Sequence, residues 1–239
     1  MTSPPAGNRP TRSETTPVTV GGVEARSFPG AVVVIDVIRA FTSAAAAFGV
    51  GAREIRCVES IERALELGAI IDGSVVMGEE RGQPPEGFDL GNSPLQFDEI
   101  DLEGRVVVQR TSNGTRGLAQ VSAPLVLAAS AVNLGATALR AAAMPPVHLV
   151  CTGSTSEDRA CADHLAALLG GGAPDPDVTC RRVLDAADEH RAFWTRQRSD
   201  AEFAEFEADI AACAEVDRYP FAMIGRRDGD QVVLTRHDG

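Results

Sequence analysis

The chain contains no lysine, and all 22 of its basic residues are arginines. This absence excludes chemistry that depends on a lysine amine, namely a Schiff base, a lysine general base and the phosphate-binding lysine of P-loop enzymes. An anionic ligand would therefore have to be held by arginine side chains or by backbone N–H groups. The motifs GxSxG, HExxH, GxxxxGK[ST] and GxGxxG are also missing, so no common hydrolase or nucleotide-binding signature is present.

Cysteine is sparse and long apolar runs are absent. The five cysteines are scattered, with no CxxC pair, which is typical of reduced thiols in a cytoplasmic protein. No apolar run approaches the roughly 20 residues that a membrane-spanning helix needs, so we expect no membrane partner. Residues 1–16 are rich in Pro, Ser and Thr without an apolar segment, which predicts a disordered tail rather than a secretory signal. The net charge of −12 argues against nucleic-acid binding.

After this tail the chain alternates between strand and helix patterns. The run Ala31 to Ile35 is continuously apolar, as in a strand buried on both faces of a parallel sheet. The alanine-rich residues 42–48 then predict a helix. In the following helix pattern, Ser60 is a candidate N-cap and Gly68 a candidate end. Similar strand–helix pairs continue through about 140 residues, which predicts an α/β fold with a layered sheet.

The C-terminal third has a different character. Residues 183–215 are charged and helical in pattern, and they contain the only tryptophan. They could form a lid, a dimer surface or a simple cover for the sheet. The last residues, from Phe221 onward, read as two strands around an Asp-Gly turn.

Polar residues gather where five predicted strands end. In an open α/β sheet, ligands bind in the crevice outside the carboxyl ends of the strands, so these groups predict one shared site. A polar residue at a strand end is also often only the N-cap of the next helix. The groups are Asp36, Glu79 with Glu80, Thr111 to Asn113, Ser130 with Asn133, and Thr152 with Ser154 and Asp158.

Asp36 is the most unusual of these residues because apolar residues flank it on both sides. A buried carboxylate needs a cation or several hydrogen-bond donors. Arg39, three residues on, is one candidate cation, and a bound metal is the other. With Glu79 or Glu80 and with Asp158, Asp36 would supply the oxygen ligands that Mg²⁺ prefers.

Two glycine-containing stretches add candidate ligand contacts. "TSNGT" offers two hydroxyls and a kinked backbone before a helix, which suits a phosphate or sulfonate. "GFDLGNSPLQF", residues 87–97, is rich in turn-forming residues. Three of its polar side chains, Asp89, Asn92 and Ser93, either face the crevice or brace the loop.

Taken in order, the motifs "VIDVIRAFTS", "GEERG", "GFDLGNSP", "TSNGT", "ASAVN", "TGSTSEDRACA" and "DIAACAEVDRYPF" resemble the 2-phosphosulfolactate phosphatases of coenzyme M biosynthesis, the ComB family. The resemblance runs from about Val34 to Phe221. It implies a three-layer α/β/α fold with a largely parallel or mixed central sheet, in a single domain over residues 17–239. It also implies Mg²⁺-dependent hydrolysis of 2-phospho-3-sulfolactate to 3-sulfolactate and phosphate.

The residues and the resemblance together predict a set of site residues. The expected partner is a small anionic phospho-acid, and a homodimer is one possible assembly. Three alternatives stay open: a phosphatase for another small phospho-acid, a non-catalytic anion-binding protein of the same fold, and an α/β nucleotide hydrolase, against which the missing P-loop lysine counts. Phe41 replaces a small hydroxyl residue more usual in the family, which predicts a reshaped pocket wall. The predicted catalytic residues are Asp36, Arg39, Glu79 and Asp158; the metal ligands Asp36, Glu79, Glu80 and Asp158; and the substrate-binding residues Arg81, Asp89, Asn92, Ser93, Ser112, Asn113, Gly114, Thr115, Ser130 and Asn133.

Overall fold

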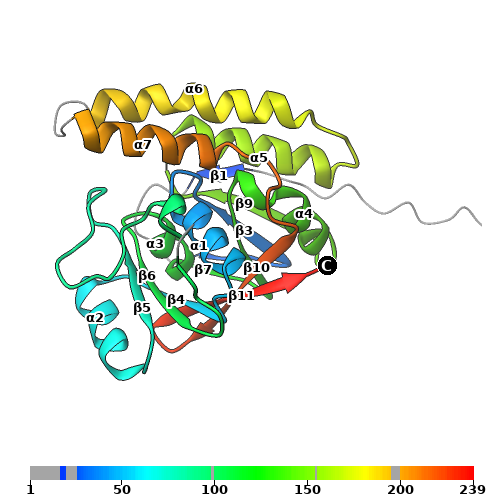
Figure 1. Ribbon diagram of the computed structural model, residues 1–239. Coiled ribbons are helices and arrows are strands. Elements are labelled where there is room, and N and C mark those ends of the chain that lie inside the picture. The colour runs from blue at the N-terminus through cyan, green and yellow to red at the C-terminus, as the bar shows by residue number, and fades with distance from the viewer. Residues whose placement is uncertain (1–16, 20–25, 98–99, 154, 195–199) are drawn as a thin grey trace, which may run out of the picture.

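A computed structural model describes residues 17–19, 26–97, 100–153, 155–194 and 200–239. The predicted tail, residues 1–16, lies outside the described residues. The described chain forms a mixed nine-stranded sheet with helices on both faces (Figure 1), which confirms the predicted α/β/α fold. The strands of this sheet are β1 (Pro17–Thr19), β3 (Ala31–Ile35), β4 (Glu54–Val58), β5 (Val75–Gly78), β6 (Val106–Arg110), β8 (Leu125–Ala129), β9 (Val147–Cys151), β10 (Phe221–Asp228) and β11 (Gln231–Asp238).

The helices lie between the strands in sequence, with one helical hairpin before the last two strands. A separate short pair is formed by β2 (Arg26–Ser27) and β7 (Val121–Ser122). The helices are α1 (Ala40–Gly49), α2 (Ile61–Ile70), η1 (Pro94–Phe97), α3 (Gly114–Ala119), η2 (Ala131–Asn133), α4 (Leu134–Ala142), α5 (Ser156–Leu169), α6 (Pro176–Trp194) and α7 (Asp200–Cys213).

The sheet consists of two parallel blocks joined by the C-terminal hairpin. One block is β1-β9-β3-β8 and the other is β4-β6-β5. The hairpin β10-β11 lies between them, with β10 antiparallel to β8 and β11 antiparallel to β4. Three successive pairings between the blocks are antiparallel, so the strands of one block run in the direction opposite to those of the other. The predicted hairpin is confirmed, and its place in the middle of the sheet is new.

Helix α1 packs between the two blocks, which brings their ends together. Its residues 40–48 are all buried, and Figure 1 shows it in the middle of the molecule. Its core cluster includes Val34 of β3 and Val107 of β6. The alanines allow close packing on several sides, while Phe41 and Phe48 fill the remaining space. Full burial of such a side chain stabilises the fold by roughly 1.5–3 kcal/mol.

The remaining helices cover the outer faces of the two blocks. Helices α4 and α5 pack on the β3-β8-β9 side and α2 packs on the β4-β5-β6 side. Ser60 caps α2 as predicted, with its hydroxyl accepting a hydrogen bond from Arg63 N. The prediction that α2 ends at Gly68 is wrong, because the helix continues to Ile70. Gly68 instead allows close packing, since a Cβ there would lie 2.4 Å from Val76 Cγ2.

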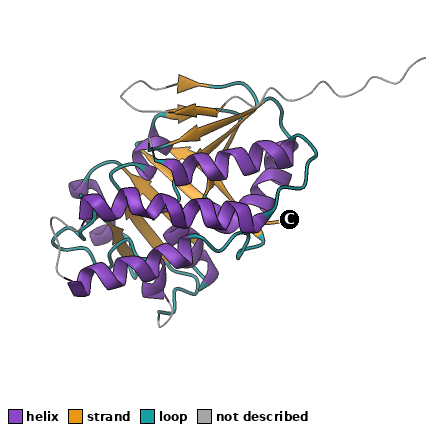
Figure 2. Cartoon of the chain, turned by 90° about the horizontal axis from the view of Figure 1, so that it is seen from above, coloured by secondary structure: helices purple, strands orange, loops and turns teal. Residues whose placement is uncertain are grey.

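Helices α6 and α7 form an outer layer beyond α5. They run side by side in both views (Figures 1 and 2), and α6 packs on α5. Helix α7 also contacts η1, in the loop after β5. It therefore reaches from the outer layer to the ends of the central strands.

Candidate active site

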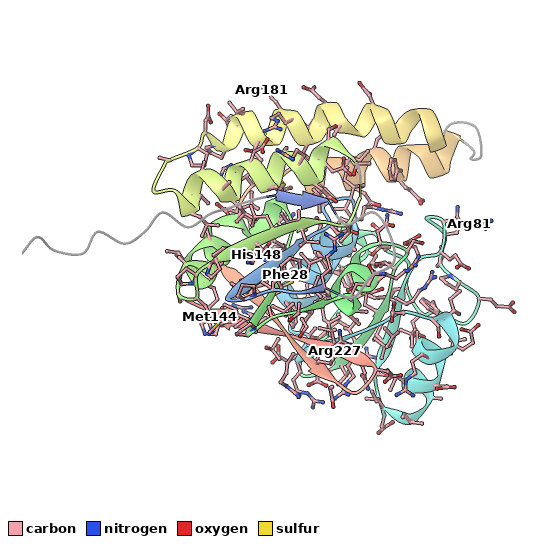
Figure 3. The ribbon with its side chains drawn as sticks, turned by 180° about the vertical axis from the view of Figure 1, so that it is seen from behind. Phe28, Arg81, Met144, His148, Arg181 and Arg227 are labelled. Carbon is pink, nitrogen blue, oxygen red and sulfur yellow. The ribbon has the colours of Figure 1, made fainter. Side chains whose placement is uncertain are left out.

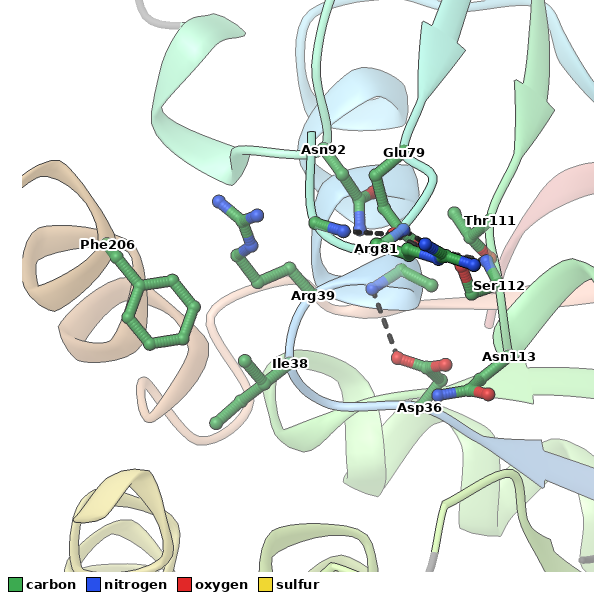
Figure 4. A pocket seen from close by; sticks show the side chains of 12 residues that line it. Asp36, Ile38, Arg39, Glu79, Arg81, Asn92, Thr111, Ser112, Asn113 and Phe206 are labelled. Atoms are coloured by element: carbon green, nitrogen blue, oxygen red, sulfur yellow. Dashed lines mark hydrogen bonds between the residues drawn. The ribbon is translucent and has the colours of Figure 1, made fainter. Parts of the chain in front are cut away.

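A cavity of about 240 Å³ opens where α1 begins and where β3, β5 and β6 end. Figure 4 shows side chains from both parallel blocks around it, and Phe206 of α7 on one side. The cavity therefore joins segments that are up to 170 residues apart in the chain. Its lining residues are Asp36, Ile38, Arg39, Ala40, Glu79, Arg81, Gly82, Asn92, Thr111, Ser112, Asn113 and Phe206.

Asp36 is a buried carboxylate at the floor of this cavity, with only 6% of its surface exposed. Its Oδ1 accepts a hydrogen bond from Ala40 N (3.2 Å), and its Oδ2 accepts one from the Thr152 hydroxyl (2.9 Å). Burial raises the pKa of Asp36 from 3.8 to about 6, and the charges of Glu79 and Glu157 act in the same direction. No cation pairs with it among the described residues. Asp36 is therefore a carboxylate held in place without charge compensation.

Asp158 lies beneath this floor and does not line the cavity. It is almost completely buried. It accepts hydrogen bonds from Val37 N (2.9 Å) and Gly153 N (3.1 Å), so it ties the loop after β3 to the loop after β9. Burial and the nearby charge of Asp36 raise its pKa well above the ordinary value. Its predicted role as a metal ligand stays a prediction.

The structure separates the two adjacent glutamates. Glu79 lines the cavity, and its carboxylate accepts hydrogen bonds from Ser112 N and Gly82 N, both at 2.6 Å. Glu80 is half exposed, lies outside the cavity lining and pairs with Arg110 at 3.1 Å. Of the two candidates, Glu79 is thus the one that lines the cavity.

Two arginines flank the cavity on different sides. Arg81 lies on the exposed loop after β5 (Figure 3), beside Glu79 and Ser112, and forms no ion pair with a described residue. The Arg39 guanidinium turns the other way, toward Phe206 (Figure 4). It donates to Asp209 of α7 and lies 5.3 Å from the centre of the Phe206 ring.

The stretch "GFDLGNSPLQF" combines bracing and lining residues. Asp89 is exposed, and its Oδ2 accepts a hydrogen bond from Val76 N at 2.8 Å, so it braces the loop against β5. Asn92 is buried and lines the cavity, and its Oδ1 has no hydrogen-bond partner. The Ser93 hydroxyl donates to Asp209. A buried amide oxygen without a partner is costly, so a hydrogen-bond donor or a cation at this edge of the cavity would stabilise it.

The loop "TSNGT" is also divided between lining and bracing. Thr111, Ser112 and Asn113 line the cavity. Thr115 does not, because its hydroxyl and backbone exchange hydrogen bonds with Thr111. Gly114 is required by packing, since a Cβ there would lie 2.6 Å from Ala40 Cβ and 3.0 Å from Asp36 Oδ2.

Three other residues that the sequence predicted at the site lie behind the cavity wall. Ser130 and Asn133 are completely buried and do not line the cavity. Asn133 Oδ1 accepts a hydrogen bond from Ser130 N (3.0 Å), which closes the turn after β8. Phe41 lies in the core around α1, so the expectation that it reshapes the pocket wall is wrong.

Sequence reasoning missed Phe206 and Asp209. Both come from the charged segment 183–215, whose place in the fold the sequence left open. Asp209 is 2% exposed although it sits on a helix of the outer layer. An acidic residue that is buried in this way needs specific donors, and Arg39 and Ser93 supply them.

Comparisons with known proteins identify the family. A sequence model described as 2-phosphosulpholactate phosphatase matches residues 18–228. A protein of Thermus thermophilus is 42% identical over 226 residues, which is 88% of this chain and 94% of that protein. One from Synechococcus sp. (strain CC9605) is 35% identical over 212 residues, covering 80% and 86%, respectively. Both are named probable 2-phosphosulfolactate phosphatases. The chain belongs to the 2-phosphosulfolactate phosphatase family.

The family assignment confirms the resemblance seen in the sequence motifs. A further relative, from Synechococcus sp. (strain RCC307), carries the same name and is 36% identical over 221 residues, covering 82% of this chain and 89% of that protein. Among the described residues, no helix combines the length and apolar character needed to cross a membrane. All five cysteines are described and are free thiols, as expected.

Whether this family member suits a magnesium ion can be tested against the side chains present. Among the described residues, no three His, Cys, Asp or Glu side chains gather closely enough to hold a metal unaided. Mg²⁺ commonly needs only one or two carboxylates, completed by water and substrate phosphate. Asp36, Glu79 and the partnerless Asn92 Oδ1 offer such oxygens around one cavity. The donor set therefore fits Mg²⁺ without a closed protein cage.

Proposed function

We propose that this protein is a Mg²⁺-dependent phosphatase that hydrolyses 2-phospho-3-sulfolactate to 3-sulfolactate and phosphate, a reaction of coenzyme M biosynthesis. The observation that carries the proposal is a cavity lined by two carboxylates, Asp36 and Glu79, and by two arginines, Arg39 and Arg81. The names of the relatives support the same activity.

The arginines provide the binding chemistry that this substrate requires. The substrate carries a phosphate, a sulfonate and a carboxylate, whereas the protein has a net charge of −12. Binding therefore depends on a local concentration of positive charge. Arg39 and Arg81 supply it, and the planar guanidinium matches phosphate and sulfonate oxygens. The Ser112 hydroxyl lies beside Arg81 and the Asn113 side chain beside Asp36 (Figure 4), as further polar contacts.

Asp36 is the residue best suited to take part in the bond-breaking step. With a pKa of about 6, it is mostly ionised at neutral pH while remaining a useful proton acceptor. It would either accept the proton of an attacking water or attack the phosphorus atom itself. In the first route, the proton taken from water passes to the sulfolactate oxygen as the P–O ester bond breaks. In the second, the sulfolactate oxygen leaves with a proton from solvent, and a water molecule then hydrolyses the phosphorylated Asp36 to release phosphate. Borohydride added during turnover separates the two routes, because it reduces a phosphorylated aspartate to homoserine and leaves a free carboxylate unchanged.

Glu79 would hold the loops of the site in register, because its carboxylate binds backbone N–H groups of both the "GEERG" and "TSNGT" segments. Asp36 and Glu79, with Asn92 Oδ1, are the residues that would hold Mg²⁺. When bound, the ion would neutralise negative charge on the phosphoryl oxygens.

The decisive experiment measures phosphate release from synthetic 2-phosphosulfolactate during a Mg²⁺ titration, with EDTA as the control. Phospholactate and phosphoglycerate are assayed in parallel. We expect Mg²⁺-dependent release that favours 2-phosphosulfolactate. Faster turnover of another phospho-acid would show that the proposed substrate is wrong, while the proposed phosphatase reaction would stand. Ligand-induced thermal stabilisation without any phosphate release would instead indicate an anion-binding protein and refute the proposal.

A further inference from the structure

Arg39 occupies the junction between the cavity described above and a second, larger one. The second cavity has a volume of about 500 Å³. It is bordered by α7 and by the loop that contains "GFDLGNSP". Arg39, Gly82, Asn92 and Phe206 line both cavities. The two spaces are therefore neighbouring chambers separated by Arg39 and Phe206.

The position of Arg39 is set by helix α7. Asp209 accepts a hydrogen bond from Arg39 Nη1 and a second from the Ser93 hydroxyl. The guanidinium carbon lies 5.3 Å from the Phe206 ring centre, within the range of a cation–π contact. Asp209 and Phe206 are three residues apart on one helix, so they present to the same side. Both the charge and the plane of Arg39 are thus fixed from outside the sheet.

The two site arginines are consequently directed to opposite ends of the cavity. In Figure 4, Arg81 lies beside Glu79 and Ser112, while Arg39 points away from Asp36 toward Phe206. A substrate with a phosphate at one end and an acid group at the other would meet one arginine at each end. The phosphate belongs at the Asp36 and Arg81 end, because the reactive carboxylate is there.

We propose that Asp209 is a positioning residue that holds Arg39 for the acid group of the substrate, its carboxylate or sulfonate, with the acid-bearing end directed toward the second cavity. The inference rests on the proposed function for the identity of the substrate. Arginine suits this role because one guanidinium can bind a carboxylate of the protein and still present N–H groups to a ligand.

The test separates binding of the acid group from binding of phosphate. Calorimetry measures the affinity of wild type and of Asp209→Asn for 3-sulfolactate and, separately, for inorganic phosphate. We expect the affinity for sulfolactate to fall about 10-fold, because a misdirected guanidinium loses its geometry, while the affinity for phosphate stays unchanged. Asp185→Asn is the matched control, since it makes the same change at an exposed position on α6.

The kinetic counterpart compares 2-phosphosulfolactate with isopropyl phosphate, a monoester that lacks the acid group. Asp209→Asn should raise KM for the first about 10-fold with little change in kcat, the pattern of lost ground-state binding. It should leave kcat/KM for the second unchanged, and Asp209→Glu should restore part of the loss. Equal losses for both monoesters, or for both calorimetric ligands, would overturn the inference and indicate a structural role for Asp209.

Two further outcomes are distinguishable. If the wild type releases no phosphate, the proposed function fails, and the calorimetric comparison still tests Asp209. If Asp209→Asn does not fold, Ser93→Ala removes one of the two donors that hold Asp209. That variant should show a smaller loss of sulfolactate affinity with unchanged phosphate affinity, and an unchanged affinity for both would refute the inference.

Discussion

Replacing Asp36 by asparagine should stabilise the metal-free protein at the same time as it abolishes activity. Burial raises the pKa of Asp36 from 3.8 to about 6. Because the folded state disfavours the ionised form, wild-type folding is penalised once the carboxylate is ionised. A rise of about two pKa units corresponds to about 3 kcal/mol at 25 °C. Asparagine removes the charge and keeps an oxygen that can accept the hydrogen bond from Ala40 N.

The sign of the pH dependence follows from the same shift. Below pH 3.8 the carboxyl is protonated in both folded and unfolded chains, so the penalty is absent. It grows as the pH rises, because the unfolded chain ionises first, and it is complete above about pH 6. The stability gain of Asp36→Asn should therefore be largest at about pH 8 and fall by about half at about pH 5. Asp158 strengthens this trend, because the Asp36 charge also raises its pKa.

The assay is urea unfolding in EDTA at about pH 5 and about pH 8, with Asp185→Asn as an exposed control. Adding Mg²⁺ should stabilise the wild type and not Asp36→Asn, because a ligand that binds only the folded state shifts the unfolding equilibrium. The prediction would be refuted if Asp36→Asn were less stable than wild type by the same amount at both pH values. That result would mean that Asp36 is a structural carboxylate that the fold stabilises in its ionised form.

Two further substitutions test the geometry of the cavity. Glu79→Gln should lower kcat/KM by about 100-fold, the order found when one electrostatic contact to a reacting group is lost. Glu80→Gln should change kcat/KM less than about threefold, because the pair between Glu80 and Arg110 is half exposed. Equal effects of the two substitutions would contradict the assignment of Glu79. Gly114→Ala should destabilise the fold by about 1–3 kcal/mol, since the new Cβ would lie 2.6 Å from Ala40 Cβ. Gly91→Ala should not destabilise it, because a Cβ there has no neighbour nearer than 3.8 Å. Urea unfolding of both variants measures this difference in stability.

The strands and most helices could be predicted because they depend on local patterns. The run Ala31 to Ile35 has the composition of a buried strand, and Ser60 has the side chain and spacing of an N-cap. The order of the strands could not be predicted, because it depends on pairings between distant segments. The C-terminal hairpin pairs Val126 of β8 with Gly225 and Ile55 of β4 with Leu234, and no local pattern specifies these partners.

The site was predicted from the rule that parallel strands end at the same edge of a sheet, and this rule holds only within each parallel block. Carboxyl ends of parallel strands lie at one edge, yet the hairpin reverses the direction between β3 and β6. Their ends meet because both blocks pack around α1, where Gln109 Nε2 donates to Ala40 O at 2.9 Å. The sequence could not distinguish Asn92, which faces the cavity, from Asp89, which braces the loop. Asp209 was missed because its burial depends on how α7 packs over the site.

The absence of lysine and the burial of acidic side chains are connected through this site. An ammonium is a compact, strongly hydrated charge, and it presents no planar fork that fits carboxylate or phosphate geometry. A guanidinium is planar and always charged, with five N–H groups, so it can be fixed by the protein and still bind a ligand. Arg39 is held by Asp209 and Phe206, and Arg110 by Glu80 and the Glu79 carbonyl. In a chain with a net charge of −12, the Asp209 carboxylate thus orients Arg39, one of the two arginines proposed to bind the anionic substrate. Removal of such a carboxylate would make the site more positive and yet weaken binding, because the orientation of the guanidinium, and not the total charge, limits recognition.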